Sequence, residues 1–346
     1  MTKVQTVWKG FLYFPFKLKG MSQNYSEKTN YYTFAFYNLE NLFDTQNDPH
    51  TLDEDFTAAS PKSWNETRFR KKISNLAKVI SKIGTDKYGF PPVLLGVAEV
   101  ENSTVLDALV ASKQLQDKMY SYVHFDSPDE RGIDTALLYR KNYLEILSKE
   151  THTLYVTNKF GERDFTRDIL HVHAKLEEHP LHILVNHWPS RRQGDEVTSY
   201  KRIAAAKKNL DIITTILSEN PNERIIIMGD FNDDPQSESI QKLTSENFYN
   251  PMEVLLSNIQ GSLNHDETWH LFDQVIISHN FLQGNPNPFQ FESAHIFDPQ
   301  EVREKIEKYK HLPLRTYVGT KYLGGYSDHF PVYSIFSVKS TNSENY

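Results

Sequence analysis

A short apolar run about two thirds of the way along the chain leads directly into a dense group of acids and amides. Residues 225–228 read IIIM, and residues 229–235 continue as GDFNDDP. A short β-branched run predicts a buried strand, and the residues after it predict a polar loop. Carboxylates at a strand end are held rigidly and still face solvent, as a hard cation or a phosphate requires. Asn, Asp and Pro also favour turns, so a solvated turn is the alternative.

The complete absence of cysteine limits how such a site can bind a metal. Disulfides and thiolate ligands are excluded, so any metal must take oxygen or histidine ligands. The formal net charge of −7 argues against a protein that coats nucleic acid through a basic surface. It is compatible with an enzyme that cuts phosphodiesters through a local basic patch.

The pattern of strands and helices predicts one mixed α/β domain without a flexible linker. Strands are expected at residues 33–37, 93–98, 120–125, 135–139, 169–176, 181–185, 225–228, 272–278, 289–295 and 330–337, and helices at 68–83, 103–110, 198–217 and 237–243. This alternation favours helices on the outer faces of two packed sheets. Residues 1–30 are expected to be a leader, 31–338 the functional domain and 339–346 a tail, with Met21 as an alternative start.

Acids, amides and histidines recur where predicted strands begin or end. They are Asn38, Glu99, His187, Asp230 with Asn232, Asp273, and the triplet Ser327-Asp328-His329. Each of these residues alone has an ordinary structural explanation, such as ending a strand or capping a turn. Together they predict one shared site. Because hard oxygen ligands dominate and cysteine is absent, Mg²⁺ or Mn²⁺ fits this site better than zinc does.

The order of these residues resembles that of the endonuclease/exonuclease/phosphatase superfamily. That group includes pancreatic-type deoxyribonucleases, abasic-site endonucleases, sphingomyelinases and inositol-polyphosphate 5-phosphatases. The resemblance covers residues 31–338 and rests on the GDFN and SDH blocks occurring in this order. The segments YNLENLFD, RGID and HWPSR are closer to bacterial nuclease-like members. The resemblance implies a four-layer α/β sandwich, in which two packed mixed β-sheets are flanked by helices, and metal-dependent hydrolysis of phosphoesters.

Carried over from the family, Glu99 would be the principal Mg²⁺ ligand, with Mn²⁺ as an alternative ion. Asn38 and Asp328 would complete or support the metal shell, and whether one or two ions bind stays open. Glu101 is a rival for Glu99, because alternate residues of a strand face the same side. Many family members carry a glutamine at the position of Ala98, so a polar neighbour of the metal ligand is missing here.

The resemblance also implies how water and phosphate are handled. His329 would contact the scissile phosphate or help activate water, and Asp273 would orient its ring. Asp230 would position or deprotonate the attacking water, and the roles of Asp230 and His329 could be exchanged. Asn232 would bind the phosphate or orient Asp230, and His187 would face the leaving group, as a candidate general acid.

Arginines near the HWPSR segment suit phosphate contact, because guanidinium binds phosphate bidentately. Arg191 ends this segment, Arg192 follows it directly, and Arg167 is a further candidate. For Arg167 and Arg192 a solvated surface position is an equal alternative.

We therefore expect a Mg²⁺-dependent hydrolase of phosphodiester bonds, an endonuclease on DNA or RNA. The alternatives are a phosphatase or phosphodiesterase of small or lipid phosphoesters, of inositol phosphate or sphingomyelin type, and a catalytically inactive binding module. The expected partner is nucleic acid or another phosphoester substrate, with no stable membrane insertion and a monomeric state. The cytoplasm is the favoured location because no convincing signal peptide or transmembrane segment is present.

Overall fold

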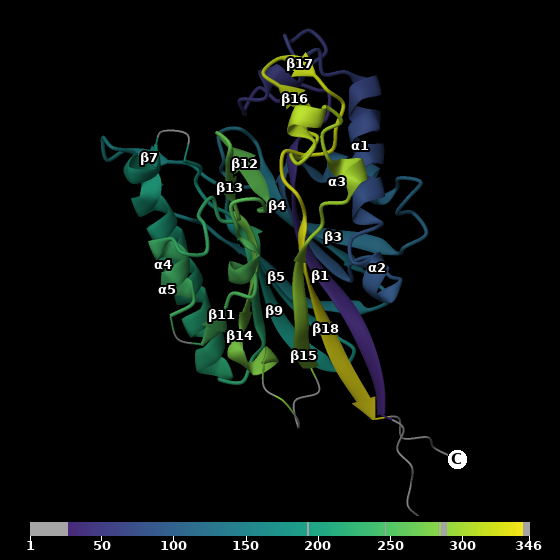
Figure 1. Cartoon of the computed structure of the whole chain (residues 1–346). Helices are drawn as coiled ribbons and strands as arrows, with labels where there is room; N and C mark the ends of the chain where they lie inside the picture. Colours follow the sequence, from purple (N-terminus) through teal and green to yellow (C-terminus); the bar gives the residue numbers. More distant parts are fainter. Residues whose placement is uncertain (1–26, 192–193, 246, 283, 285–288, 342–346) are drawn as a thin grey trace, which may run out of the picture.

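Two six-stranded mixed sheets pack face to face, and helices cover their outer sides (Figure 1). The computed structural model describes residues 27–191, 194–245, 247–282, 284 and 289–341. The expected four-layer α/β sandwich is confirmed. The expected leader lies outside the described residues up to residue 26, and the expected tail lies outside them from residue 342.

The first sheet has parallel strands β1 and β2 at its centre. Its order is β15 (Phe289–Ile296), β18 (Val332–Thr341), β1 (Glu27–Leu42), β2 (Leu94–Val100), β4 (Asp134–Arg140) and β3 (Tyr120–His124). Asn38 of β1 pairs in register with Ala98 of β2. Because parallel strands run in the same direction, the residues that follow this pair meet at one edge of the sheet.

The second sheet has parallel strands β9 and β10 at its centre. Its order is β11 (Phe248–Tyr249), β14 (Asp273–Ser278), β10 (Ile225–Asp230), β9 (His179–His187), β8 (Ile169–Leu176) and β5 (Leu144–His152). Asp230 pairs in register with His187 on one side and with Asp273 on the other. Three residues that lie far apart in the sequence therefore become neighbours at one edge of this sheet.

Helices cover the outer face of each sheet. Helices α1 (Glu66–Ile80) and α3 (Ser103–Val110) pack on the first sheet, α4 (Asp195–Glu219) and α5 (Glu238–Leu243) pack on the second, and α2 (Thr85–Tyr88) is a single turn. Short 3₁₀ helices are η1 (Glu54–Phe56), η2 (Glu253–Leu255), η3 (His279–Phe281), η4 (Gln300–Val302) and η5 (Glu307–Tyr309). No helix in the described part of the chain combines the length and apolar character needed to cross a membrane.

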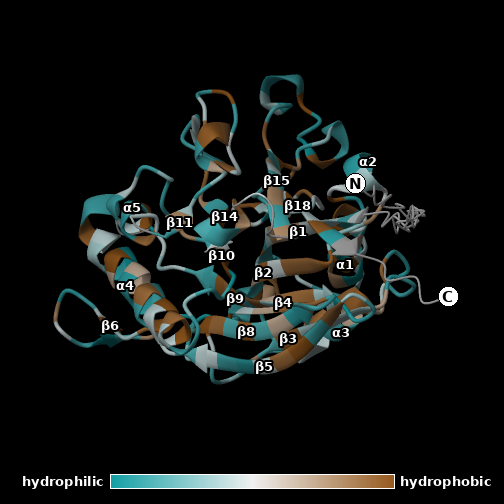
Figure 2. Cartoon of the chain, turned by 90° about the horizontal axis from the view of Figure 1, so that it is seen from below, coloured by the Kyte–Doolittle hydropathy of each residue, from teal (hydrophilic) through white to brown (hydrophobic). Residues whose placement is uncertain are grey.

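The interior consists of three buried apolar layers. The central layer lies between the sheets and includes Val172, Ile226 and Phe336. On the second sheet, Ala205 of α4 packs near Ile227 of β10, and Figure 2 shows hydrophobic residues on α4 where it lies beside the strands. Burying one such large apolar side chain contributes about 1.5–3 kcal/mol, so these layers hold the strand ends in a fixed arrangement.

Every expected strand and helix is present. The strand at 169–176 and the helix at 103–110 have the expected bounds, and the bounds of the others are shifted. Strand β5 and three short hairpins were not expected: β6 (Val156–Thr157) with β7 (Arg163–Asp164), β12 (Leu263–His265) with β13 (Thr268–His270), and β16 (Tyr317–Val318) with β17 (Lys321–Tyr322). β5 escaped the sequence pattern because it is an edge strand whose residues are mostly polar and exposed. Two of these hairpins, β12–β13 and β16–β17, stand at the same end of the sandwich (Figure 1).

Candidate active site

A cavity of about 350 Å³ lies at the edge where the central strands of both sheets end. Among the residues expected from the sequence, those that line it are Glu99, Arg167, His187, Arg191, Asp230, Asn232, Asp328 and His329. Asn38 and Asp273 lie behind this lining, because Asn38 is hydrogen-bonded to Asp230 and Asp273 to His329. The structure thus brings all ten of these residues together.

Asp230 is a buried carboxylate at the centre of this group. Its Oδ1 accepts the backbone N–H of Asn232 at 3.0 Å, and its Oδ2 accepts Nδ2 of Asn38 at 3.0 Å. Burial raises the pKa of Asp230 to about 6, although the charge of His329 opposes this shift. A carboxylate with such a pKa can accept a proton near neutral pH.

His329 and Asp273 form a buried carboxylate–histidine pair. Nδ1 of His329 lies 2.7 Å from Oδ2 of Asp273, and Nε2 on the other side of the ring lies 4.0 Å from Oδ2 of Asp230. Burial would lower the pKa of His329, but the charge and hydrogen bond of Asp273 raise this pKa well above its ordinary value. The Nε2 of His187 lies 3.8 Å from the same Asp230 oxygen. Two histidines therefore approach one carboxylate.

Ser327 ties the SDH segment to the first sheet. Its hydroxyl donates to the backbone carbonyl of Asn38 at 2.7 Å and accepts the backbone N–H of His329 at 3.1 Å. One side chain thereby links β1 to the loop that carries Asp328 and His329. This linking contact is not visible in the sequence, where Ser327 is only the first letter of a motif.

Glu99 lines the cavity because the backbone of β2 is irregular at this point. Its φ is +62°, a conformation that non-glycine residues adopt rarely. The pairing of β2 with β4 shifts register between Ala98 and Val100. Because of this irregularity, Glu99 and Glu101 do not face the same side, as alternate residues of a regular strand would. The carboxylate of Glu101 accepts the backbone N–H of Asp44 at 2.5 Å and does not line the cavity.

The cavity offers oxygen ligands that fit a hard divalent cation. Oε2 of Glu99 accepts the backbone N–H of Asn41 at 2.8 Å, which holds the carboxylate in place. Burial would raise the pKa of Asp328, but the charges of His329 and Arg315 lower this pKa below its ordinary value, so Asp328 stays anionic. Two carboxylates in a cavity without thiolates match the donor preference of Mg²⁺ or Mn²⁺.

The side chain of Asn38 and a cluster of three other expected residues are engaged in hydrogen bonds within the protein. Nδ2 of Asn38 donates to Asp230, and its Oδ1 accepts the backbone N–H of Glu40 at 2.9 Å. Asp230, Asp273 and His329 are close enough to bind one ion. However, the 2.7 Å contact between His329 and Asp273 is a hydrogen bond. The cluster of Asp230, Asp273 and His329 is therefore better suited to orienting the histidine ring than to holding a metal.

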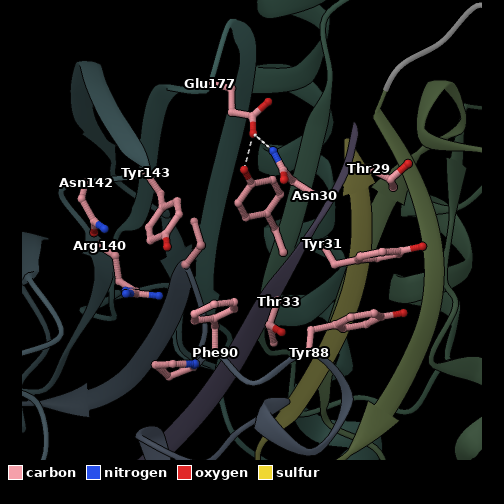
Figure 3. Close-up of a pocket in the computed structure, with 13 residues that line it drawn as sticks. Thr29, Asn30, Tyr31, Thr33, Tyr88, Phe90, Arg140, Asn142, Tyr143 and Glu177 are labelled. Atoms are coloured by element: carbon pink, nitrogen blue, oxygen red, sulfur yellow. Dashed lines mark hydrogen bonds between the residues drawn. The ribbon is translucent and has the colours of Figure 1, made fainter. Parts of the chain in front are cut away.

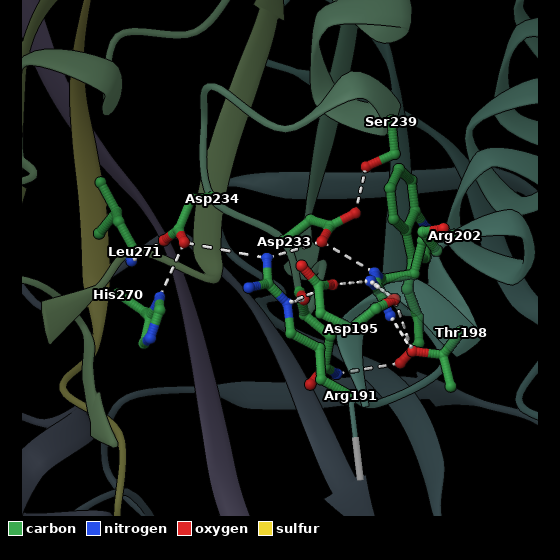
Figure 4. Close-up of polar contacts among 12 residues, drawn as sticks. Arg191, Asp195, Thr198, Arg202, Asp233, Asp234, Ser239, His270 and Leu271 are labelled. Atoms are coloured by element: carbon green, nitrogen blue, oxygen red, sulfur yellow. Dashed lines mark hydrogen bonds and ion pairs between the residues drawn. The ribbon is translucent and has the colours of Figure 1, made fainter. Parts of the chain in front are cut away.

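Arg191 braces the GDFNDDP loop (Figure 4). Its Nε donates to the backbone carbonyl of Asn232 at 2.7 Å, and its Nη2 lies 2.7 Å from Oδ1 of Asp233. The buried side chain of Arg202 makes a second ion pair with the same Asp233 oxygen at 2.8 Å. The guanidinium of Arg191 therefore lines the cavity while its charge is already balanced by a carboxylate.

Three further arginines line the cavity. Arg167 donates to Oδ2 of Asp129 at 2.9 Å and to the backbone carbonyl of Trp188 at 2.8 Å. Arg131 and Arg315 also line the cavity. Arg131 lies in the RGID segment, and Arg315 lies in the loop of bases and tyrosines at residues 310–326. Arg192 lies outside the described residues.

A larger cavity of about 650 Å³ lies at the opposite ends of β1 and β2 (Figure 3). Tyr31 and Tyr88 stack at its edge with ring centroids 4.2 Å apart. Glu177 accepts hydrogen bonds from Asn30, at 2.7 Å, and from the hydroxyl of Tyr32. None of the clusters of potential metal ligands in the described residues contains a residue of this cavity. The smaller cavity therefore remains the candidate active site.

Comparisons with known proteins agree with this arrangement. A family model described as the Endonuclease/Exonuclease/phosphatase family matches residues 33–338. No protein with a curated description matches the chain in sequence.

Solved structures with the same fold differ widely in sequence. A family protein from Bacteroides thetaiotaomicron is 16% identical, with a TM-score of 0.56 and coverage of 93% of this chain and 100% of that chain. A mannosyl-6-phosphatase from the same species is 17% identical, with a TM-score of 0.54 and coverage of 88% and 98%. TDP2 from D. rerio, in complex with a single-strand DNA product, is 15% identical, with a TM-score of 0.53 and coverage of 88% and 98%.

Proposed function

Because this chain belongs to the endonuclease/exonuclease/phosphatase family, a family of phosphoester hydrolases, we propose that it is a Mg²⁺-dependent phosphodiesterase that cleaves nucleic acid internally. The observation that carries this proposal is the position of Asp230. Its buried carboxylate lies within 4.0 Å of two histidine rings and beside a cavity that Glu99 and Asp328 line.

The metal would be held by Glu99 and Asp328, with Asn38 beside them. Bound there, Mg²⁺ supplies Lewis-acid chemistry, since it polarises a phosphoryl oxygen and neutralises charge on the departing oxygen. Mn²⁺ prefers the same oxygen ligands and is the alternative ion.

The protein's own groups would position the water and the phosphate. Asp230 would take a proton from the attacking water, and Asn38 and the backbone of Asn232 fix the direction of its carboxylate. His329, held by Asp273, would donate from Nε2 to a phosphate oxygen. His187 would protonate the leaving oxygen from the other side of Asp230.

Arginines around the cavity would contact the flanking phosphates of a nucleic-acid strand. Arg131 and Arg315 are the first candidates, because both line the cavity and Arg315 is 44% exposed. Arg167 is the third, and its guanidinium is pre-oriented by Asp129. Asp129 and Asp328 already balance part of the charge of Arg167 and Arg315, so these arginines would position the strand through directed hydrogen bonds more than through uncompensated charge.

A second candidate function is hydrolysis of a small phosphate monoester. The cavity volume of about 350 Å³ is at the lower end of what a small-molecule site requires, roughly 300–1,000 Å³. One structure with the same fold is a mannosyl-6-phosphatase. A sugar phosphate is therefore the substrate class to test against nucleic acid.

The test is a substrate panel of single-strand DNA, duplex DNA, RNA, bis-p-nitrophenyl phosphate, a sugar phosphate and an inositol phosphate. Each is incubated with Mg²⁺, with Mn²⁺ or with a chelator. We expect cleavage of an end-blocked nucleic acid that is lost in the chelator and falls by roughly 10²–10⁴-fold in Glu99→Gln and His329→Ala. Glu101→Gln is the matched control and should keep activity. Turnover of the sugar or inositol phosphate alone would establish the second function, and full activity in both variants would refute both functions.

A further inference from the structure

The outer face of the second sheet carries a row of histidines at a distance from the cavity. His171 and His173 alternate along β8, so they point to the same side of the sheet. His182 of β9 pairs in register with His173. Glu150 of the edge strand β5 pairs with His171, and His152 ends the same strand.

Three of these side chains place their ligand atoms at the corners of a nearly equilateral triangle. Nδ1 of His171 lies 3.1 Å from Oε1 of Glu150 and 3.4 Å from Nε2 of His152. The third side, from Nε2 of His152 to Oε1 of Glu150, is 3.5 Å. Adjacent ligands of a tetrahedral ion with bonds of 2.0–2.1 Å are about 3.3–3.4 Å apart. The triangle therefore has the size of one face of such a coordination shell.

The ring of His171 is oriented by neighbours behind it. Its Nε2 lies 2.8 Å from Nδ1 of His182, and the ring of His182 stacks on that of His173 with centroids 4.1 Å apart. Nδ1 of His171 donates to Glu150 when it carries the ring hydrogen. In the other tautomer Nε2 donates its hydrogen to His182, and Nδ1 keeps a lone pair for a metal beside Glu150 and His152. Metal-binding histidines in proteins are commonly fixed by such a hydrogen bond on the second ring nitrogen.

We propose that Glu150, His152 and His171 form a second metal site, which binds a transition-metal ion of the Zn²⁺ class. Two imidazole nitrogens and one carboxylate oxygen are a donor set that Zn²⁺ accepts, whereas Mg²⁺ prefers oxygen ligands alone. His171 is buried, but the side chains of Glu150 and His152 are 62% and 23% exposed. Water can therefore occupy the fourth position.

The position of this site gives the metal a structural consequence. His152 pairs in register with Ile169, so the site lies where residues 153–168 leave the sheet and return to it. This loop contains the β6–β7 hairpin and Arg167, which lines the catalytic cavity. A metal that bridges β5 and β8 would close the base of this loop and hold the edge strand in the sheet. Metal binding should therefore raise the thermal stability of the protein.

The experiment uses the full chain, stripped of metal with a chelator and titrated with Zn²⁺ by calorimetry. Glu99→Gln weakens binding at the catalytic centre and serves as the background. Glu150→Gln and His152→Gln are made in it, together with Glu145→Gln as the matched control. Glu145 lies on the same strand, is 61% exposed and is ion-paired to Lys175.

We expect one Zn²⁺ site in the background and in the Glu145→Gln control. Loss of a residue that only supports a ligand weakens metal binding roughly 10–100-fold, so loss of Glu150 or His152 should weaken it at least about 100-fold. Zn²⁺ should raise the melting temperature of the control and leave that of the two ligand variants unchanged. Made in the wild-type chain, the same two variants should keep full Mg²⁺-dependent phosphoesterase activity.

Equal Zn²⁺ affinity in Glu145→Gln, Glu150→Gln and His152→Gln would overturn the proposal. So would the absence of any Zn²⁺ site in the Glu99→Gln background. Co²⁺ gives an independent readout, because a tetrahedral Co²⁺ site absorbs visible light more strongly than an octahedral one. This absorption should appear in the control and be missing in the two ligand variants.

Discussion

Nδ1 of His329 lies 2.7 Å from Oδ2 of Asp273, and both side chains are buried. This hydrogen bond places one ring hydrogen on Nδ1 and directs Nε2 toward Asp230. The two residues lie on different elements, since Asp273 begins β14 and His329 lies in the loop before β18. The contact therefore joins the two sheets at the cavity.

Asp273→Asn should lower kcat by roughly 10²–10⁴-fold, because an amide no longer holds the His329 ring as an ionised carboxylate does. Steady-state rates on the best nucleic-acid substrate give this number. The double variant with His329→Ala should be no slower than His329→Ala alone, since the two side chains act as a unit. Additive losses in the double variant would show that Asp273 acts independently of His329.

Activity should fall on the acid side of about pH 6, because burial raises the pKa of Asp230 to about 6 and protonation removes its capacity to accept a proton. The measurement is kcat/KM between about pH 5 and pH 8 at saturating Mg²⁺, with circular dichroism to confirm that the fold persists. A flat profile down to about pH 5 would show that Asp230 is not the group that accepts the proton.

Glu101 should make the protein less stable as the pH rises. Burial raises the pKa of Glu101 from 4.5 to about 8. The folded state therefore binds a proton that the unfolded state releases, so the stabilisation is fully present below about pH 4.5 and is lost as the pH rises through about 8. Glu101→Gln should flatten this part of the profile of melting temperature against pH. Identical profiles for the wild type and the variant would contradict the raised pKa.

Asp233→Asn should destabilise the fold, because Asp233 is 4% exposed and forms ion pairs with both Arg191 and Arg202. Breaking a buried ion pair costs about 3–5 kcal/mol, which urea unfolding would measure. Asp266→Asn is the control, since the side chain of Asp266 is 92% exposed and its variant should unfold like the wild type. A change below about 1 kcal/mol at Asp233 would mean that the arginines find other partners.

Much of the fold could be predicted from local sequence pattern. The apolar run before Gly229 is a buried strand, and the helical periodicity of residues 68–83 corresponds to α1. β5 could not be predicted, because residues 145–151 lack buried alternation and their pairing partner lies beyond the β6–β7 hairpin. An edge strand pairs with another strand on one side only. Which strand it pairs with depends on the rest of the sheet and not on the residues of the edge strand itself.

The candidate site could also be predicted only in part. The sequence showed which types of residue form it, since acids, amides and histidines at strand ends, in a fixed order, predicted one shared site. Two features were not visible. Glu99 turns into the cavity through a backbone with positive φ, and the hydroxyl of Ser327 links β1 to the loop that carries His329. Neither a strained backbone conformation nor a contact between distant segments can be predicted from the residues next to it in the sequence.

The sequence alone determined the chemistry available to this protein: oxygen and nitrogen ligands without thiolates, rigid strand ends and the acids placed there. Tertiary structure decided which of those acids meet. The glycine of GDFNDDP illustrates the reason, because a side-chain Cβ at Gly229 would lie 2.3 Å from the carbonyl oxygen of Asn186 on β9. The close approach of β9 and β10 sets His187 beside Asp230, and only the packed sheet creates that approach.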